Sequence, residues 1–206
     1  MAPKYKLTYF DFRGVGEPIR YLLSYGGADF EDNRIKLEDW PKFKSSTPYG
    51  KMPLLEVDGK EVYQSSAICR YLAKQFKLIG SNDWEALQID CTVDTITDLK
   101  LAISGAHSFE GNEEAKAKKI QILQKETLPM YLSKLDKQVK DNGGHFVGGK
   151  LTWADLYFAS QLDTWGAAKQ GKSPIDDYPN LKGLYDKVNA LPAIKAWIAK
   201  RPVTVW

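Results

Sequence analysis

The hydrophobic and polar positions of the first 76 residues change their period repeatedly. Alternating, aromatic-rich residues 4–10 predict a β-strand, and residues 11–16, with two glycines, predict a loop. Pro18 suits the first turn of a helix that stops at Gly26-Gly27, and residues 30–35 predict a second strand. A strand, a helix and a strand in this order predict a right-handed βαβ unit.

The next stretch predicts two antiparallel strands and a helix. Asp58-Gly59 lies between two alternating runs that follow Pro53, and this is the strongest short signal of a β-hairpin. Ser65 is a natural N-cap for a helix whose apolar residues recur at helical spacing as far as Phe76. The first part of the chain therefore predicts β-α-β followed by β-β-α.

Residues 78–83 have the composition of a linker, and beyond them the pattern is helical almost throughout. Thr152-x-x-Asp155 is a capping pattern, and Asn142-Gly143-Gly144 is a typical helix end. Helices are predicted over about 84–107, 113–140, 156–162, 180–190 and 193–200. We expect a boundary near residue 80, with an α/β domain at 1–79 and an all-α domain at 80–206.

The composition is that of a folded globular protein. The chain has 206 residues, of which 43% are hydrophobic and 27% charged, far from the profile of a disordered chain. No apolar run approaches the ~18 residues that span a bilayer, and residues 1–7 lack the apolar stretch of a signal peptide. We expect a cytoplasmic protein that does not bind membranes.

The net charge of +3 comes from the first part of the chain. Residues 1–80 carry 13 Lys and Arg against 10 Asp and Glu, whereas residues 81–206 carry 16 of each sign. This excess could attract a small anion, but it is too weak for the basic face that binds nucleic acid.

Histidine and cysteine are too scarce for the usual catalytic constellations. His107 and His145 are the two histidines and have no metal-ligand spacing, so we expect no metal. Cys69 and Cys91 lie far apart in helical patterns and are predicted to be reduced core thiols. The chain also lacks GxSxG and the glycine motifs that bind phosphate, which argues against hydrolases, kinases and dehydrogenases.

Three positions indicate a small anionic peptide at one edge of the predicted sheet. Tyr9 ends the first strand, where open α/β sheets place ligands. Ser65 lies at a helix N-terminus, whose N–H groups and dipole favour a carboxylate. Met52-Pro53 is a plausible cis peptide bond that would present backbone groups to an extended peptide.

Each of these residues also has a simpler interpretation. Tyr9 is one of 11 tyrosines, and an aromatic residue in a strand usually contributes to the core. Ser65 alone is a helix cap, and Asp98 alone is a charge on a helix surface. Trp40 and Met52 alone would be core or edge residues.

Six motifs in the same order make the chain resemble the sigma-class cytosolic glutathione S-transferases of the insect type, which are similar to hematopoietic-type prostaglandin D synthases. The motifs are Lys6-Leu7-Thr8-Tyr9-Phe10, Asp39-Trp40-Pro41, residues 48–59, residues 64–72, Val93-Asp94-Thr95 and Leu151-Thr152-Trp153-Ala154-Asp155. The resemblance covers essentially the whole chain. It implies a thioredoxin-like first domain, a helical second domain, a homodimer, and glutathione as the co-substrate.

The resemblance also implies a role for individual residues. The hydroxyl of Tyr9 would hydrogen-bond the sulfur of glutathione and stabilise its thiolate. The other expected glutathione contacts are Trp40 and Lys44 at the glycine end, Met52 at the cysteinyl backbone with Gly50 and Lys51 beside it, Gln64 and Ser65 at the γ-glutamyl carboxylate, and Asp98 reaching across the dimer to the γ-glutamyl amine.

An apolar pocket for the electrophile is expected next to this site. It would lie between Phe10, Phe12 and Val15 on one side and the end of the first long helix, around Gly105 and His107, on the other. The C-terminal Trp206 either folds over this pocket, as terminal residues do in similar proteins, or belongs to a frayed tail. Such a pocket suits lipid-derived aldehydes, hydroperoxides or planar aromatic electrophiles.

The chain departs from prostaglandin-isomerising members of the family in three places. Those members carry an arginine near the thiolate where this chain has Val15, and a tryptophan in the product pocket near the position of Gly105 or Ala106. Thr97 interrupts the Asp-x-x-Asp-Asp cluster with which some members bind a divalent cation. These differences weaken the expectation of isomerase activity and of activation by metal.

The sequence therefore predicts an enzyme that conjugates the glutathione thiolate to hydrophobic electrophiles. A glutathione-dependent lipid peroxidase or prostaglandin isomerase on the same site is one alternative. A non-catalytic ligand-binding or crystallin-like structural protein is an alternative from another class.

Overall fold

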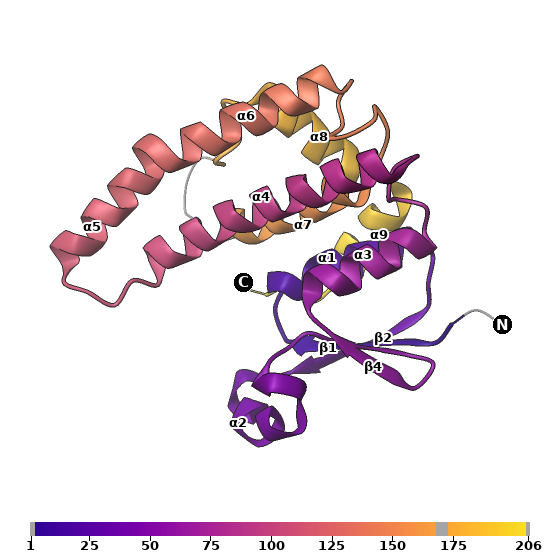
Figure 1. The fold of residues 1–206 in the computed structure, drawn as a ribbon. Helices are drawn as coiled ribbons and strands as arrows, with labels where there is room; N and C mark the ends of the chain where they lie inside the picture. Colours follow the sequence, from indigo (N-terminus) through magenta and orange to yellow (C-terminus); the bar gives the residue numbers. More distant parts are fainter. Residues whose placement is uncertain (1–2, 168–172, 205–206) are drawn as a thin grey trace.

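The computed structural model describes residues 3–167 and 173–204 and divides into a sheet with its helices and a larger helical part (Figure 1). No helix in these two described ranges is long and apolar enough to cross a membrane. The elements follow the predicted order, from a βαβ unit through a hairpin to a series of helices.

The sheet has four strands in the order β2-β1-β3-β4. Strands β1 (Tyr5–Phe10) and β2 (Phe30–Ile35) pair in parallel, and β1 pairs antiparallel with β3 (Leu54–Val57). Strand β4 (Lys60–Tyr63) completes the hairpin, where Asp58 and Gly59 have φ of 50° and 80°, the left-handed conformation that a tight hairpin turn needs. All four predicted strands are confirmed.

Three helices belong to this first part of the chain. Helix α1 (Glu17–Tyr25) connects β1 to β2, and α3 (Ser65–Gln75) follows β4. The short α2 (Trp40–Phe43) lies apart from both, at the other side of the sheet in Figure 1. Short 3-10 turns cover Gly14–Gly16, Leu37–Asp39, Lys44–Ser46 and Pro48–Gly50.

The predicted N-cap of α3 is wrong by one residue. Gln64, not Ser65, is the N-cap, and Ser65 is the first helical residue. Gln64 has φ of 74°, so the chain turns out of β4 at this residue and helical geometry begins immediately after it. The backbone N–H of Ser65 therefore lies within the first turn of the helix, among the groups that lack an intrahelical acceptor.

The second part of the chain consists of the predicted helices. They are α4 (Asp83–His107), α5 (Glu113–Ile122), α6 (Leu128–Asp141), α7 (Trp153–Ala167), α8 (Pro179–Asn189) and α9 (Pro192–Lys200). The single helix expected over 113–140 is divided by a π-helical turn at Leu123–Thr127. Pro129 follows this turn and has no N–H to donate, which is a physical reason for the local change in hydrogen bonding.

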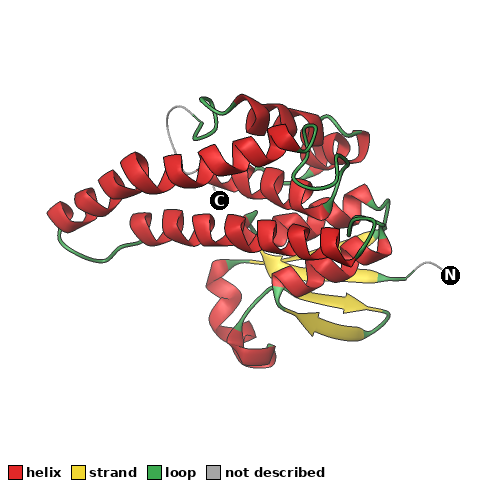
Figure 2. Cartoon of the chain, turned by 45° about the horizontal axis from the view of Figure 1, so that its top comes forward, coloured by secondary structure: helices red, strands yellow, loops and turns green. Residues whose placement is uncertain are grey.

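Helices α1 and α3 cover one face of the sheet, and α7 and α9 pack against α1 (Figures 1 and 2). The core is one continuous cluster that joins both parts of the chain. Leu7 and Leu55 from the sheet, Leu23 from α1 and Phe158 from α7 are all fully buried in it. Helix α7 therefore packs close to the segment that follows β1.

The capping pattern before α7 is confirmed. Asp155 is fully buried, and its carboxylate accepts hydrogen bonds from Thr152 N at 2.7 Å, Thr152 Oγ1 at 3.1 Å and Phe146 N at 2.9 Å. This one side chain holds the loop before α7 as well as the first turn of the helix.

Both cysteines are free, but only one of them is in the core. Cys69 is buried, and burial raises the pKa of its thiol far above the ordinary value. The prediction of a core thiol is wrong for Cys91, which is exposed. Helix α4 buries Ile89 and Val93 against its neighbours, so Cys91, lying between them in sequence, points to another side.

Candidate functional site

Tyr9 lies at the end of β1, and its side chain is only 5% exposed. The backbone N–H of Val15 donates a hydrogen bond to its hydroxyl oxygen at 3.2 Å. Burial raises the pKa of the Tyr9 phenol, while this N–H and the nearby Arg20 guanidinium act in the opposite direction. The phenol is therefore neutral at neutral pH, and its proton is available for donation to an acceptor.

The segment after β1 approaches Tyr9 so closely that two positions require glycine. A Cβ at Gly14 would lie 2.6 Å from the Tyr9 hydroxyl, and one at Gly16 would lie 2.4 Å from Cδ1 of its ring. Gly14 also has φ of +43°, in the left-handed region. These contacts show that the ring of Tyr9 has no room to move toward Gly16.

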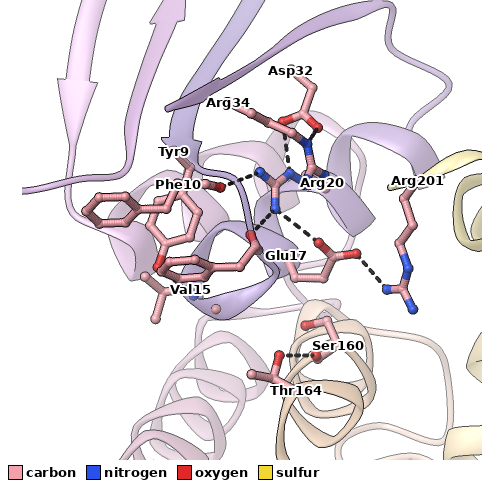
Figure 3. A network of polar contacts seen from close by, with 12 residues as sticks. Tyr9, Phe10, Val15, Glu17, Arg20, Asp32, Arg34, Ser160, Thr164 and Arg201 are labelled. Carbon is pink, nitrogen blue, oxygen red and sulfur yellow. Dashed lines mark hydrogen bonds and ion pairs between the residues drawn. The ribbon is translucent and has the colours of Figure 1, made fainter. Parts of the chain in front are cut away.

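Arg20 on α1 donates hydrogen bonds to the backbone around the end of β1, next to Tyr9 (Figure 3). Its side chain is fully buried, and its Nη1 and Nη2 donate to the carbonyl oxygens of Phe12 at 2.9 Å and Phe10 at 3.5 Å. Ion pairs with Glu17 at 3.2 Å and Asp32 at 2.9 Å balance its charge. A buried cation thus fixes the backbone on both sides of residue 11, directly after Tyr9.

Glu17 extends this network to the C-terminal helix. Its Oε1 accepts hydrogen bonds from Trp197 Nε1 and from Arg201 Nη1, both at 2.8 Å. The carboxylate is fully buried and lies between Arg20 and Arg201 in Figure 3. Sequence reasoning missed Glu17 and Arg20; two charged residues three positions apart, within a run that is otherwise apolar, were the available signal.

The Met52-Pro53 peptide bond is cis, as predicted. It lines a small cavity of about 60 Å³ together with residues from β4 and the start of α3. Four of the sequence-predicted residues are brought together there: Lys51, Met52, Gln64 and Ser65. The cavity combines exposed backbone next to Pro53 with the N-terminus of a helix of 11 residues, a combination suited to a peptide with a carboxylate.

Trp40 and Lys44 lie on the segment between β2 and β3. The rings of Trp40 and Phe10 meet edge to face, with 5.2 Å between their centroids. The side chain of Lys44 runs across Gly50, because a Cβ at Gly50 would lie 3.1 Å from Cε of Lys44. Trp40 is therefore connected to the Tyr9 strand, and Lys44 to the segment that leads to Met52.

The aromatic residues expected in the electrophile pocket form a cluster around Tyr9. Phe10 and Phe12 stack with 5.2 Å between centroids, and Phe12 meets the Tyr9 ring edge to face at 5.5 Å. Val15 is half-buried beside them. The structure thus groups these residues at one side of Tyr9.

Two further predicted pocket residues lie at the end of α4. Gly105 and His107 are exposed on the last turns of α4, and His107 Nδ1 lies 2.8 Å from the Ile103 carbonyl oxygen. Trp206 lies outside the described residues. The described tail nevertheless reaches the Tyr9 loop, since Arg13 Nη2 donates to the carbonyl oxygen of Thr204 at 3.1 Å.

Asp98 is exposed on α4, and its role at a dimer interface stays a prediction. The neighbouring Thr97 bonds the Val93 carbonyl oxygen at 2.9 Å and the Tyr157 hydroxyl at 3.0 Å, so it connects α4 to α7. Within the described part of the chain, no three His, Cys, Asp or Glu residues are grouped in a way that could hold a metal ion.

Comparison with family models gives two matches. The model described as the glutathione S-transferase N-terminal domain matches residues 5–74, and the one described as the glutathione S-transferase C-terminal domain matches residues 97–201. Together they span most of the chain.

Individual relatives agree with these matches. The chain is 49% identical over 200 residues to "Glutathione S-transferase S1" of Drosophila melanogaster, covering 97% of this chain and 80% of that protein. The structure described as prostaglandin synthase D of Nilaparvata lugens has 50% identity and a TM-score of 0.89, covering 98% of this chain and 100% of that one. A further structure, described as monomeric Na-GST-3 from Necator americanus, has 35% identity and a TM-score of 0.86, covering 98% and 100%. These likenesses confirm the expected thioredoxin-like first domain followed by a helical one.

Proposed function

Because this chain belongs to the glutathione S-transferase family, we propose that Tyr9 activates the thiol of glutathione for addition to hydrophobic electrophiles. The protein is a transferase, and glutathione is its co-substrate. The observation that carries the proposal is the buried Tyr9 hydroxyl, whose oxygen already accepts the Val15 N–H and whose proton remains to be donated. We also propose the sigma class, a role in detoxification in the cytoplasm, and domain limits of 1–79 and 80–206.

A single hydrogen bond is energetically close to sufficient for this activation. A free thiol has a pKa of ~8.5, so only a few per cent is thiolate at neutral pH. Lowering that pKa by about 2 units requires ~2.7 kcal/mol of preferential stabilisation of the thiolate. A hydrogen bond to a charged group contributes ~1.5–3 kcal/mol, so one placed hydroxyl can supply most of it.

The small cavity beside Met52 is the proposed location of the γ-glutamyl end of glutathione. Gln64 and Ser65 lie at the N-terminus of α3, where free N–H groups and the helix dipole attract a carboxylate. Trp40 and Lys44 would hold the glycine end, with Lys44 supplying a positive charge. Met52 would pair its backbone with the cysteinyl residue between them, which points the thiol toward Tyr9.

Replacement of Tyr9 by Phe tests the proposed role of the hydroxyl. Y9F removes one oxygen and keeps the ring that packs against Gly16, so the fold should be unchanged. We expect kcat/KM for a model aromatic chloride to fall at least about tenfold at neutral pH, because the thiolate loses its donor. Retention on immobilised glutathione should stay nearly intact. Unchanged turnover would reject Tyr9 as the thiolate donor.

A prostaglandin isomerase or a lipid peroxidase on the same site is the second candidate. It is favoured by the 50% identity to the protein described as prostaglandin synthase D. Val15 and Gly105 depart from the residues expected in isomerising members, so we place conjugation first. Turnover of an aromatic chloride, an unsaturated aldehyde, a lipid hydroperoxide and a prostaglandin endoperoxide, all with glutathione, separates these activities.

We further propose that the enzyme is a homodimer to which Asp98 contributes. Val62 on β4 and Tyr71 on α3 are both at least 40% exposed and line a hollow of about 610 Å³, an apolar surface of the kind that a second copy covers. The monomeric relative from Necator americanus makes this a question for measurement.

Sedimentation at working concentrations should give twice the mass of the chain. Replacement of Asp98 by Asn should then raise KM for glutathione several-fold without changing the sedimentation coefficient, since the side chain would contact the partner's γ-glutamyl amine. A monomer with full activity would contradict both statements.

A further inference from the structure

The loop beside Tyr9 is also held by a residue from the helical part of the chain. Gln161 on α7 is fully buried, and its Nε2 donates a hydrogen bond to the carbonyl oxygen of Gly14 at 3.1 Å. The two residues are 147 positions apart in the sequence. In Figure 3, the neighbouring residues Ser160 and Thr164 mark the position of α7 next to the Val15 segment.

The two hydrogen bonds at this loop belong to one peptide group. The carbonyl of Gly14 and the N–H of Val15 are joined by the same peptide bond, which is trans, as are all described peptide bonds except Met52-Pro53. The C=O and N–H of a trans peptide point in opposite directions from one plane. The group therefore lies between Gln161, which donates to its oxygen, and Tyr9, which accepts from its nitrogen.

We propose that Gln161 is a positioning residue that acts on glutathione activation through the Gly14-Val15 peptide group and the hydroxyl of Tyr9. This inference rests on the proposed role of Tyr9. By fixing the plane of the peptide, Gln161 keeps the Val15 N–H aimed at one lone pair of the phenol oxygen. The hydroxyl proton is thereby turned away from the loop and left free for the sulfur.

The hydrogen bond from Gln161 also strengthens the donor. A carbonyl that accepts a hydrogen bond polarises its peptide group, and the N–H of that group becomes a better donor. A better donor to the phenol oxygen favours the negative charge that develops there as the hydroxyl shares its proton with the thiolate. The Val15 N–H already lowers the pKa of Tyr9 against the effect of burial.

The stability of the fold does not by itself explain a glutamine at position 161. Its Oε1 is buried, and no described residue donates a hydrogen bond to it. A buried polar atom without a partner destabilises the folded state by about 1–3 kcal/mol, which offsets what the hydrogen bond from Gln161 to Gly14 contributes to stability. A buried polar side-chain atom that lacks a hydrogen-bond partner is expected at a functional site.

The test compares Gln161→Met with a matched amide elsewhere. Gln138 on α6 also donates from Nε2 to a carbonyl oxygen outside its helix, that of Phe146 at 3.0 Å, and in addition to Thr92 Oγ1 at 2.9 Å. Q161M and Q138M therefore both remove an amide that donates to a loop carbonyl, but only Q161M does so at the Tyr9 loop. Q161E is a rescue variant, because burial favours a protonated carboxyl, whose O–H can still donate to Gly14.

Two pKa values are measured in each folded variant. The first is that of the bound glutathione thiol, from the ultraviolet absorbance of its thiolate against pH. The second is that of the Tyr9 phenol in the enzyme without glutathione, from NMR of labelled tyrosine assigned with Y9F. Q161M should raise both by about half a unit to one unit. Because a thiol pKa lowered by about 2 units lies just below neutral pH, this rise should lower kcat at pH 7 about 1.5- to threefold through the loss of thiolate. KM for glutathione should stay within about twofold.

The double variant shows whether Gln161 works through Tyr9. In a Y9F background, Q161M should not change the thiol pKa any further. Q138M should leave both pKa values unchanged, and Q161E should lie near the wild type. Unchanged pKa values in folded Q161M, or a full shift that persists in Y9F/Q161M, would overturn the inference.

Failure of the proposed function gives a different result. If Y9F itself leaves the thiol pKa unchanged, Tyr9 is not the thiolate donor. The pKa of the Tyr9 phenol then still shows whether Gln161 affects the hydrogen bond that the Val15 N–H donates to the phenol oxygen.

Discussion

Glycines as well as a charged residue determine the position of the Tyr9 side chain. Its ring lies against Gly16, its hydroxyl lies near Gly14, and Arg20 is 5.8 Å from the ring centroid. These contacts restrict the movement of the ring, which is what donation to a sulfur of fixed location requires. Glycines in the loop therefore determine where the phenol can act.

Gly16→Ala should damage activity through this contact. The added methyl group would lie 2.4 Å from Cδ1 of Tyr9, so the ring must shift. We expect kcat/KM to fall about tenfold or more, because displacements of this order cost up to about a hundredfold when they misalign a reacting group. Gly183→Ala is the control: no atom lies within 4 Å of its Cβ, and helix α8 should gain roughly 0.5–1 kcal/mol. Full activity of G16A would show that the Tyr9 ring has room to move.

Helix α7 connects the sheet-containing part of the chain to the helical part through several contacts. It packs against α1 and α4, it carries Gln161 to the Tyr9 loop, and the hydroxyls of its Tyr157 and of Thr97 on α4 are hydrogen-bonded to each other. Burial raises the pKa of Tyr157 to about 12. The direction in which α7 enters the core is set at its first turn, by Asp155.

Asp155→Ala should destabilise the whole fold. It removes the acceptor of two buried backbone N–H groups, those of Phe146 and Thr152. Since each unsatisfied buried donor costs about 1–3 kcal/mol, we expect a loss of at least about 2 kcal/mol in the free energy of unfolding, measured with urea. Asn112→Ala, which removes an exposed cap of α5, should cost about 1 kcal/mol. Equal losses of unfolding free energy in the two variants would mean that the buried cap stabilises the fold no more than the exposed one.

Across the whole molecule, a buried network of charges connects the loop after Tyr9 to the end of the C-terminal helix. It runs from the carbonyl groups of Phe10 and Phe12 through Arg20 and Glu17 to Arg201. Such networks stabilise a fold only while every charge has its partner, since an unpaired buried charge is strongly unfavourable. The network therefore couples the stability of α9 to the geometry next to Tyr9.

Glu17→Gln tests this coupling. The substitution keeps the shape but leaves Arg20 and Arg201 with less negative charge, so we expect a loss of about 3–5 kcal/mol in stability and reduced activity in the protein that remains folded. Glu31→Gln is the matched control, because Glu31 pairs with Lys6 in an exposed ion pair at 3.0 Å. That variant should leave the unfolding midpoint almost unchanged. A similar midpoint in E17Q and E31Q would contradict a structural role for the network.

Local pattern was enough to predict much of this protein. The turn at Asp58-Gly59, the capping pattern at Asp155 and the cis bond before Pro53 depend on a few neighbouring residues, so they can be recognised in the sequence. The exposure of Cys91 and the N-cap at Gln64 were missed, because the orientation of a helix and an unusual backbone angle depend on what surrounds them.

What the sequence determined by itself was the order of strands and helices and, through its motifs, the family and the position of Tyr9. These properties follow from the period of apolar residues and from short-range turn and cap chemistry. Only the tertiary structure decided which groups surround the phenol. The contacts from Gln161 to Gly14 and from Arg201 to Glu17 join residues 147 and 184 positions apart, and no local pattern encodes a hydrogen bond that exists only after the helices have closed over the sheet.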